Sequence, residues 1–354
     1  MKTFSIESRA LMVLLDKSFP RAIQYTWKKN GSVLHGQPKP ISKIELVLHD
    51  GSNSSLTGFP PSNGWHRGRK KKIDRGPTKI CEPVVRFKKK NSSSAVYKLF
   101  VKELNVTITA VFEVKKNVLS FTITDIKGKR EKEIRYITIP DHGLLSVCAS
   151  ESGSSVAAVR TGFVNHQKEM FSRVSRMKPE RKSTAWSYVM MNTRNLAGTV
   201  WNNVLLDRER FFTRISNNKT LGKSCSLSCA YWTWREIPGE KFEHPTARVV
   251  ITTDINGDGK VDWQDAALAY RSIDEPPLGA DLVRERISSQ IAMNFASWAQ
   301  NPFLRVLDAM KKVYLYTDGL GQDIQFKGFA AEGHDSSHPD YGGNVNQRAG
   351  GRDE

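Results

Sequence analysis

Short runs of apolar and β-branched residues fill the amino-terminal part of the chain, and several of them alternate with polar residues. In the run that begins at Val106 every second side chain up to Phe112 is apolar. Such alternation is typical of a strand with one buried face. Strand-length runs at this density, with Gly, Ser and Asn between them, predict an antiparallel β-sandwich over residues 1–243. The runs lie at residues 96–102, 106–114, 118–125, 135–139 and 156–164.

The pattern changes near residue 244. Residues 247–254 and 312–318 are short apolar runs that predict two buried strands, and each run ends on an aspartate. Residues 263–271 and 281–293 predict helices, and Asn301-Pro302 predicts the start of a third. A strand, helices and a second strand open a parallel α/β arrangement, so residues 244–354 form a second predicted domain.

The chain is long enough and apolar enough for two domains. It has 354 residues, of which 39% are hydrophobic and 9% aromatic, so a sizeable core can form. No apolar run approaches the length of a bilayer span, and a membrane span is not predicted. The apolar patch at residues 10–15 lies among charged residues without a clear cleavage site, so it does not predict a signal peptide.

The chain is strongly basic, with 54 Lys and Arg against 36 Asp and Glu and a net charge of +18. This balance is found in proteins that meet nucleic acid, an acidic glycan or an anionic membrane surface. The basic residues gather at 65–72, 88–90 and 173–182. These segments lack a nucleic-acid motif and the regular aromatic spacing of a base-stacking platform, so a nucleic acid partner is not predicted.

The cysteines and most of the aromatic residues are interpreted as parts of a core. Only Cys225 and Cys229 lie close together in the sequence, and no second pair or nearby His completes a zinc pattern, so ordinary thiols are predicted. Six aromatic residues before position 243 could stack on sugar rings, but core packing is the better interpretation for most of them. They are Trp186, Tyr188, Trp201, Tyr231, Trp232 and Trp234.

Residues 254–265 have the spacing of a calcium-binding loop. Side-chain oxygens occupy positions 1, 3, 5, 9 and 12 of the template, the carbonyl of Lys260 occupies position 7, and Gly259 occupies position 6. Calcium prefers six or more oxygen ligands, which this spacing can wrap around one point. A turn rich in Asp and Gly without a metal is the alternative. The predicted side-chain ligands are Asp254, Asn256, Asp258, Asp262 and Asp265.

A polar segment at residues 332–342 is the second candidate site. Its histidines and aspartates could ligate a metal. Its carboxylates could instead accept hydrogen bonds from vicinal sugar hydroxyls. A surface loop held by its own hydrogen bonds is equally compatible with the residues. The segment contains Glu332, His334, Asp335, His338, Asp340 and Tyr341.

Five segments in the second part of the chain resemble signature segments of the endo-α-N-acetylgalactosaminidases, in the same order. They are residues 258–271, 293–295, 299–304, 318–322 and 332–342. Upstream, residues 19–25 and 34–37 resemble the start of that family's galactose-mutarotase-like β-sandwich. The resemblance implies a multidomain chain: an antiparallel galactose-mutarotase-like β-sandwich followed by the first part of a truncated (β/α)8 barrel.

The resemblance also implies a function. The family cuts Galβ1-3GalNAc from Ser or Thr of mucin-type O-glycoproteins by a retaining mechanism, which uses a nucleophile and an acid/base. Both carboxylates are expected beyond Glu354, so this chain alone is expected to be inactive. An extracellular or cell-surface location is implied. The resemblance assigns the sugar-binding wall to Asp318, His334, Asp335, His338 and Asp340.

A non-catalytic carbohydrate-binding module, or an inactive fragment, is the alternative interpretation. It rests on the presence of the sugar-binding loop without the carboxylate pair.

Overall fold

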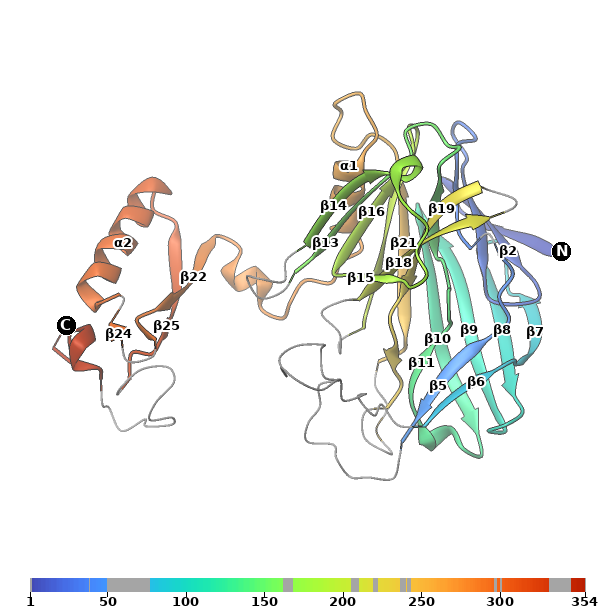
Figure 1. The fold of residues 1–354 in the computed structure, drawn as a ribbon, viewed down its shortest axis with the longest axis horizontal. Helices are drawn as coiled ribbons and strands as arrows, with labels where there is room; N and C mark the ends of the chain where they lie inside the picture. Colours follow the sequence, from blue (N-terminus) through green and yellow to red (C-terminus); the bar gives the residue numbers. More distant parts are fainter. Residues whose placement is uncertain are drawn as a thin grey trace. The chain divides into compact units, whose positions relative to one another are not determined.

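The computed structural model describes residues 2–37, 39–49, 77–161, 168–204, 210–218, 222–235, 240, 243–295, 298–299, 301–330 and 345–353. The chain divides into two compact units, Met1–Asp274 and Glu275–Glu354. The first unit consists mainly of strands, and the second holds a helix beside strands (Figure 1). No helix among the described residues is long and apolar enough to span a bilayer.

Three antiparallel sheets build the first unit. The nine-stranded sheet has, in spatial order, β14 (Lys168–Arg173), β13 (Ser155–Arg160), β16 (Tyr188–Asn192), β17 (Ala197–Asn202), β21 (Thr246–Thr252), β10 (Val118–Gly128), β9 (Val106–Lys115), β8 (Ser94–Val101) and β7 (Val84–Lys89). The eight-stranded sheet has β1 (Thr3–Glu7), β2 (Leu11–Asp16), β3 (Ala22–Trp27), β4 (Val33–His35), β12 (Leu145–Cys148), β19 (Gly222–Cys229), β18 (Phe211–Asn218) and β15 (Thr184–Trp186). The four-stranded sheet has β20 (Trp232–Thr233), β11 (Ile134–Thr138), β5 (Ile44–Leu48) and β6 (Thr78–Cys81).

Strand β9 shows why the alternating runs fold in this way. Val106, Ile108, Ala110 and Phe112 are fully buried on one face, while the threonines between them are only partly buried. Lys116 adopts a left-handed φ of 53° in the turn that leads into β10. Each fully buried large apolar side chain contributes about 1.5–3 kcal/mol to folding. The predicted antiparallel β-structure of this region is therefore confirmed.

The two large sheets share one hydrophobic core. Buried side chains from both sheets form a single cluster. Aromatic rings run through it, with centroids 5.0 Å apart for Phe112 and Phe121 and 6.1 Å apart for Phe121 and Trp232. Rings at these separations add about 0.5–1.5 kcal/mol per pair beyond the burial of their area.

A buried ion pair joins Asp16, at the end of β2, to Arg21, which lies in the first family-like segment just before β3. Arg21 is 0% exposed and Asp16 is 2% exposed, and the guanidinium donates to Asp16 Oδ2 at 2.5 Å. Arg21 also donates to the carbonyl of Gln37 at 3.1 Å. The Tyr97 hydroxyl, on β8 of the nine-stranded sheet, donates to the carbonyl of Asp16 at 2.7 Å. This network therefore joins the two sheets by polar contacts as well as by apolar packing.

The same network orders a neighbouring turn. Gln37 Oε1 accepts a hydrogen bond from the Gly143 backbone N–H at 3.0 Å. His142 Nε2 lies 3.0 Å from the carbonyl of Pro20, and because a carbonyl oxygen can only accept, this nitrogen donates. Burial lowers the pKa of His142 to about 4, so the ring is neutral near pH 7.

Strand β21 corrects the predicted domain layout. Residues 247–254 were expected to begin a parallel α/β domain, but β21 pairs antiparallel with both β10 and β17. The run is apolar on both faces because α1 (Trp263–Tyr270) covers the outside of the sheet, where Val250 packs with Ala269 and Tyr270. A strand that is apolar on both faces is typical of parallel sheets. Here the helix on the outer face produces the same pattern in an antiparallel sheet.

The second unit contains one parallel strand–helix–strand unit, displaced from the predicted positions. Residues 281–293 are not a helix: η4 (Ala280–Val283) is followed by the strand β22 (Arg286–Ala292). Residues 312–318 are not a strand, because α2 (Phe303–Tyr316) extends to Tyr316 and a turn follows it. The second strand is β25 (Gly321–Lys327), which pairs parallel with β22. The described part of the unit also contains the short strands β23 (Asn294–Phe295) and β24 (Trp298–Ala299) and the turn η5 (Gln347–Ala349).

The apolar spacing of α2 explains the error at residues 312–318. Leu307, Met310, Val313 and Tyr314 continue one helical face, and no residue ends the helix before Thr317. Asp318 and Gly319 then adopt left-handed φ values of 50° and 88°, which turn the chain towards β25. The described part of the second unit thus contains one parallel strand–helix–strand element, and the complete barrel stays a prediction.

The boundary between the units also differs from the predicted one. The first unit ends at Asp274, whereas the sequence placed the boundary after Glu243. β21, the loop at 254–265 and α1 all belong to the first unit. The indole N–H of Trp201 on β17 donates to Asp274 Oδ1 at 2.9 Å, and this hydrogen bond holds the carboxyl end of the first unit against its sheet.

We expect Asp16→Asn to lower the free energy of unfolding by about 3–5 kcal/mol, because it leaves the Arg21 charge buried without its carboxylate. Urea unfolding near pH 7 measures this. Asp141→Asn is the matched control, since Asp141 pairs with Arg214 on the surface, where a pair contributes about 0–1 kcal/mol. An equal loss of unfolding free energy in both variants would contradict the conclusion that the buried Asp16–Arg21 pair stabilises the fold.

The Asp16 effect should depend on pH. Burial alone raises the pKa of Asp16, but hydrogen bonds from Ser18 and the contact with Arg21 outweigh it and lower the pKa below its usual value. The stabilisation is then complete above the unfolded value of about 3.9 and is lost as pH falls through the lower folded-state pKa. The gap in stability between parent and Asp16→Asn should therefore narrow below about pH 4.

Candidate functional site

The predicted sugar-binding wall is placed only in part. His334, Asp335, His338 and Asp340 lie outside the described residues. Asp318 is exposed and follows α2 at the turn into β25, so it does not stand at the end of a strand as the sequence suggested. The grouping of these five residues into one site therefore stays a prediction.

The loop at 254–265 curls around the carboxylate of its first residue. Asp254 Oδ1 accepts from the Gly257 N–H at 2.7 Å, and Oδ2 accepts from the Gly259 N–H at 2.9 Å. Gly257 and Gly259 have φ values of 76° and 82°, which a side chain at those positions would strain. Asn256 and Asp258 each accept from the backbone N–H two residues later, at 3.1 and 2.9 Å. The backbone thus follows a tight path with oxygen-bearing side chains along it.

Asp265 closes the loop from the helix side. It is 0% exposed, and its Oδ1 accepts from the Ile255 N–H at 2.7 Å while Oδ2 accepts from the Asp262 N–H at 2.9 Å. Asp262 in turn caps α1 by accepting from the Gln264 N–H at 2.7 Å. Asp262 and Asp265 form a reciprocal capping box, so one pair of carboxylates both starts α1 and closes the loop.

Only one group of described His, Cys, Asp or Glu side chains brings three ligand atoms within 4.8 Å of one another, and it is not in this loop. The group is His35, Cys148 and Glu151. Burial lowers the pKa of His35 and raises that of Glu151. Burial, and then the Glu151 carboxylate, raise the pKa of Cys148 to about 12. The sequence missed this group because His35 lies on β4, far along the chain from the turn that holds Cys148 and Glu151.

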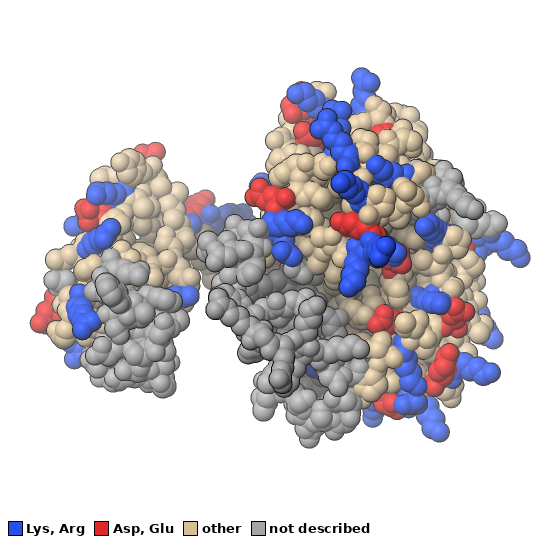
Figure 2. Space-filling model, viewed as in Figure 1, with Lys and Arg blue, Asp and Glu red and all other residues tan. Residues whose placement is uncertain are grey.

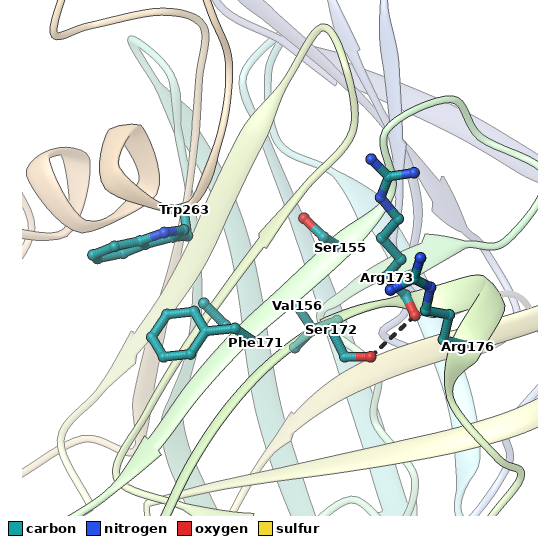
Figure 3. Close-up of a pocket in the computed structure, with 8 residues that line it drawn as sticks. Ser155, Val156, Phe171, Ser172, Arg173, Arg176 and Trp263 are labelled. Carbon is teal, nitrogen blue, oxygen red and sulfur yellow. Dashed lines mark hydrogen bonds between the residues drawn. The ribbon is translucent and has the colours of Figure 1, made fainter.

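A hollow of about 300 Å³ lies beside β13, β14 and the start of α1 (Figure 3). Phe171 from β14 and Trp263 from the start of α1 form one wall, with ring centroids 5.6 Å apart at an angle of 64°. Phe171 is 61% exposed and Trp263 is 40% exposed, which is unusual for large apolar rings. An exposed aromatic pair beside polar groups is typical of a binding surface. Ser155, Val156, Ala157 and Ser172 line the floor.

Two arginines border the hollow. Arg173 ends β14 and Arg176 lies in the 3-10 turn η3 (Val174–Arg176), and both line the hollow together with Ser172. Their guanidinium groups are visible beside the serine floor in Figure 3. Aromatic faces can stack on sugar rings, and guanidinium groups bind carboxylate or sulfate. The sequence singled out the basic segment 173–182 but missed Phe171, which carries no signal before the strands are paired.

Most of the aromatic residues first considered for sugar stacking belong to the core. Trp186, Trp201, Trp232 and Trp234 are each at most 5% exposed, as the core interpretation predicted. Tyr188 is 38% exposed and packs edge-on against Tyr270, with centroids 5.7 Å apart. Cys81, Cys148, Cys225 and Cys229 are all buried, and none of them forms a disulfide bond.

Basic side chains are spread over the visible face and interspersed with acidic ones (Figure 2). Among the described residues several are paired, for example Arg235 with Glu131 near η1 (Glu131–Glu133) and Lys28 with Glu7. The segment 65–72 lies outside the described residues. The described residues of this face therefore carry mixed charge.

Comparison with known proteins identifies both parts of the chain. Residues 77–263 match the Galactose mutarotase-like fold domain, and residues 264–354 match the family described as Endo-alpha-N-acetylgalactosaminidase. A Renibacterium salmoninarum protein named "Putative endo-alpha-N-acetylgalactosaminidase" is 32% identical over 367 residues, covering 98% of this chain and 22% of that protein. The chain thus spans about a fifth of this curated relative.

Solved structures share the fold at low identity. Alpha-N-acetylgalactosaminidase NagBb from Bifidobacterium bifidum, in complex with GalNAc, has a TM-score of 0.50 and 12% identity, covering 99% of this chain and 55% of that one. The GH36 alpha-galactosidase AgaA from Geobacillus stearothermophilus, in complex with stachyose, has a TM-score of 0.50 and 11% identity, covering 98% and 53%. From the two family matches and the curated relative, we conclude that the chain belongs to the endo-alpha-N-acetylgalactosaminidase family and carries its galactose mutarotase-like domain.

Proposed function

We propose that the protein to which this chain belongs releases Galβ1-3GalNAc from Ser or Thr of mucin-type O-glycoproteins. The observation that carries the proposal is the family match of residues 264–354 directly after a mutarotase-like domain. A retaining mechanism needs two carboxylates about 5–5.5 Å apart across the scissile bond. The proposal assigns neither of them to a residue of this chain. O-glycosylated glycoproteins outside the cell are the proposed partners.

The proposed role of residues 318–340 is to recognise the sugar. Asp318, Asp335 and Asp340 would accept hydrogen bonds from sugar hydroxyls, because a carboxylate can accept from two hydroxyls at once. His334 and His338 would donate or accept with one ring nitrogen each. The histidines and aspartates of segment 332–342 could also hold a metal, but we propose that they bind sugar hydroxyls.

We expect Asp335→Ala to lower kcat/KM for a chromogenic Galβ1-3GalNAc α-glycoside, measured on the whole protein. Loss of a hydrogen bond to a charged group costs about 1.5–3 kcal/mol. This corresponds to a roughly 10- to 100-fold decrease. Asp281→Ala is the control, because Asp281 is an exposed residue of η4 that pairs only locally with Arg284. An unchanged kcat/KM in Asp335→Ala would remove this residue from the proposed site.

A carbohydrate-binding role without hydrolysis is the second candidate, favoured by the hollow beside Phe171 and Trp263. Calorimetric titration of the chain with Galβ1-3GalNAc distinguishes the two. Binding by the chain together with no sugar release by the whole protein would favour the binding module over the glycosidase. Release of the disaccharide by the whole protein would favour the glycosidase.

We also propose that the loop at 254–265 binds one calcium ion in a structural role. Asp254, Asn256, Asp258, Asp262 and Asp265 would supply side-chain oxygens, and Lys260 its carbonyl. The path of the backbone around Asp254 and the glycines at positive φ support this. Because no three acidic side chains of the loop come within 4.8 Å of one another, the ion would have to draw them closer. The shorter Asp265 at position 12 favours weaker binding than a glutamate would.

Calcium should raise the melting temperature of the chain, and Asp258→Ala should abolish most of this increase. At a free calcium concentration 100 times Kd, the gain is about 2.7 kcal/mol. Scanning calorimetry with calcium and with a chelator measures the effect. Glu169→Ala is the control, because Glu169 is an exposed acidic residue on β14 of the same unit. If calcium does not change the melting temperature of the parent chain, the proposed calcium site is refuted.

A further inference from the structure

His35, Cys148 and Glu151 converge where the eight-stranded sheet is weakest. β4 and β12 are joined by a single residue pair, Ser146 with His35. On the two sides of this junction, β3 pairs with β4 over three residue pairs and β12 with β19 over four. The hydroxyl of Tyr25 adds one buried hydrogen bond across the junction, to the carbonyl of Leu144 at 2.5 Å.

The three side chains are held in place by backbone contacts. The Cys148 N–H donates to Glu151 Oε2 at 2.6 Å, and the Glu151 N–H donates to the carbonyl of Cys148 at 3.1 Å. This closed turn places the thiol and the carboxylate beside each other. His35 reaches them from β4, with Nε2 at 3.5 Å from Glu151 Oε1. Imidazole, thiol and carboxylate atoms all lie within 4.8 Å of one another.

We propose that His35, Cys148 and Glu151 bind a divalent transition metal ion of the zinc class, which links β4 to β12. Thiolate sulfur, imidazole nitrogen and carboxylate oxygen are the ligands that zinc takes in proteins. Ligand atoms on one tetrahedral zinc lie about 3.2–3.8 Å apart, so movements of about 1 Å would complete the site. This metal site is distinct from the all-oxygen loop at 254–265 and does not depend on glycosidase activity.

The burial of the group fits three protein ligands and one water. Cys148 is 0% exposed, so its sulfur faces the interior. The side chains of His35 and Glu151 are 20% and 19% exposed, which leaves the fourth position open to solvent. An ion bound here would link β4 to β12 across the junction, where the two strands share a single residue pair. Its role is therefore structural: it would stabilise the eight-stranded sheet.

Cobalt is a suitable probe, because a cobalt–thiolate bond gives a charge-transfer band in the near ultraviolet that oxygen ligands do not give. The metal-free chain is titrated with Co²⁺ in excess calcium, which occupies the oxygen loop. We expect one cobalt ion per chain with a thiolate band, displaced by Zn²⁺. The band should be absent in Cys148→Ser and retained in Cys225→Ser, the matched change of a buried cysteine on neighbouring β19.

Two further variants keep the thiol and test the other ligands. Glu151→Gln and His35→Gln should weaken cobalt binding at least about tenfold, since even changes outside the ligand shell have effects of this size. Zn²⁺ should raise the melting temperature of the parent chain but not that of His35→Gln. Absence of the thiolate band in the parent, its persistence in Cys148→Ser, or unchanged affinity in Glu151→Gln would each overturn the proposal.

Discussion

Strand β21 is apolar on both faces, and the architecture of the first unit depends on covering both of them. Ala247, Val249 and Ile251 enter the core between the large sheets, while Val250 points to the other side. Helix α1 covers that outer side, and the loop at 254–265 is the connection that returns the chain to do so. The acidic spacing of the loop therefore has a folding role whether or not a metal is bound, because Asp262 and Asp265 start the covering helix.

The first unit was largely predictable because its strands alternate. Strands such as β9 bury every second residue, and this period is visible in the sequence. The second unit was less predictable, because its paired strands carry few apolar residues while its helix ends in an apolar run of strand length. In β22 the residues from Arg286 to Gln290 alternate between exposed and half-buried side chains, yet its serines and glutamine carry little apolar signal. In α2 the segment after Met310 resembles a strand when it is considered alone. Together with the preceding turns, its apolar residues continue one helical face.

Site prediction met a different limit. A candidate metal loop made of consecutive residues can be recognised in a sequence. The backbone of residues 254–265 curls around Asp254, and calcium binding there stays a prediction. Phe171 and Trp263 are 92 positions apart and meet only because α1 packs on the sheet. His35 is far from Cys148 in the sequence, and the pairing of β4 with β12 brings them together. Some family-like residues also proved structural: Arg21 and Gln37 belong to a buried polar network. A resemblance between sequences does not separate residues that bind a ligand from residues that stabilise the fold. Burial in the structure separates them.

The position of α1 bears on how such proteins can be recombined. The family matches meet between residues 263 and 264, yet the compact unit extends to Asp274. A cut at the family junction would separate the mutarotase-like sheet from Ala269, Tyr270 and Ile273, and would leave the outer face of β21 uncovered. The portable module, in evolution or in a chimaera, is therefore the sheet together with the helix that follows it. A chimaera joined between residues 263 and 264 would expose the apolar outer face of β21 to solvent.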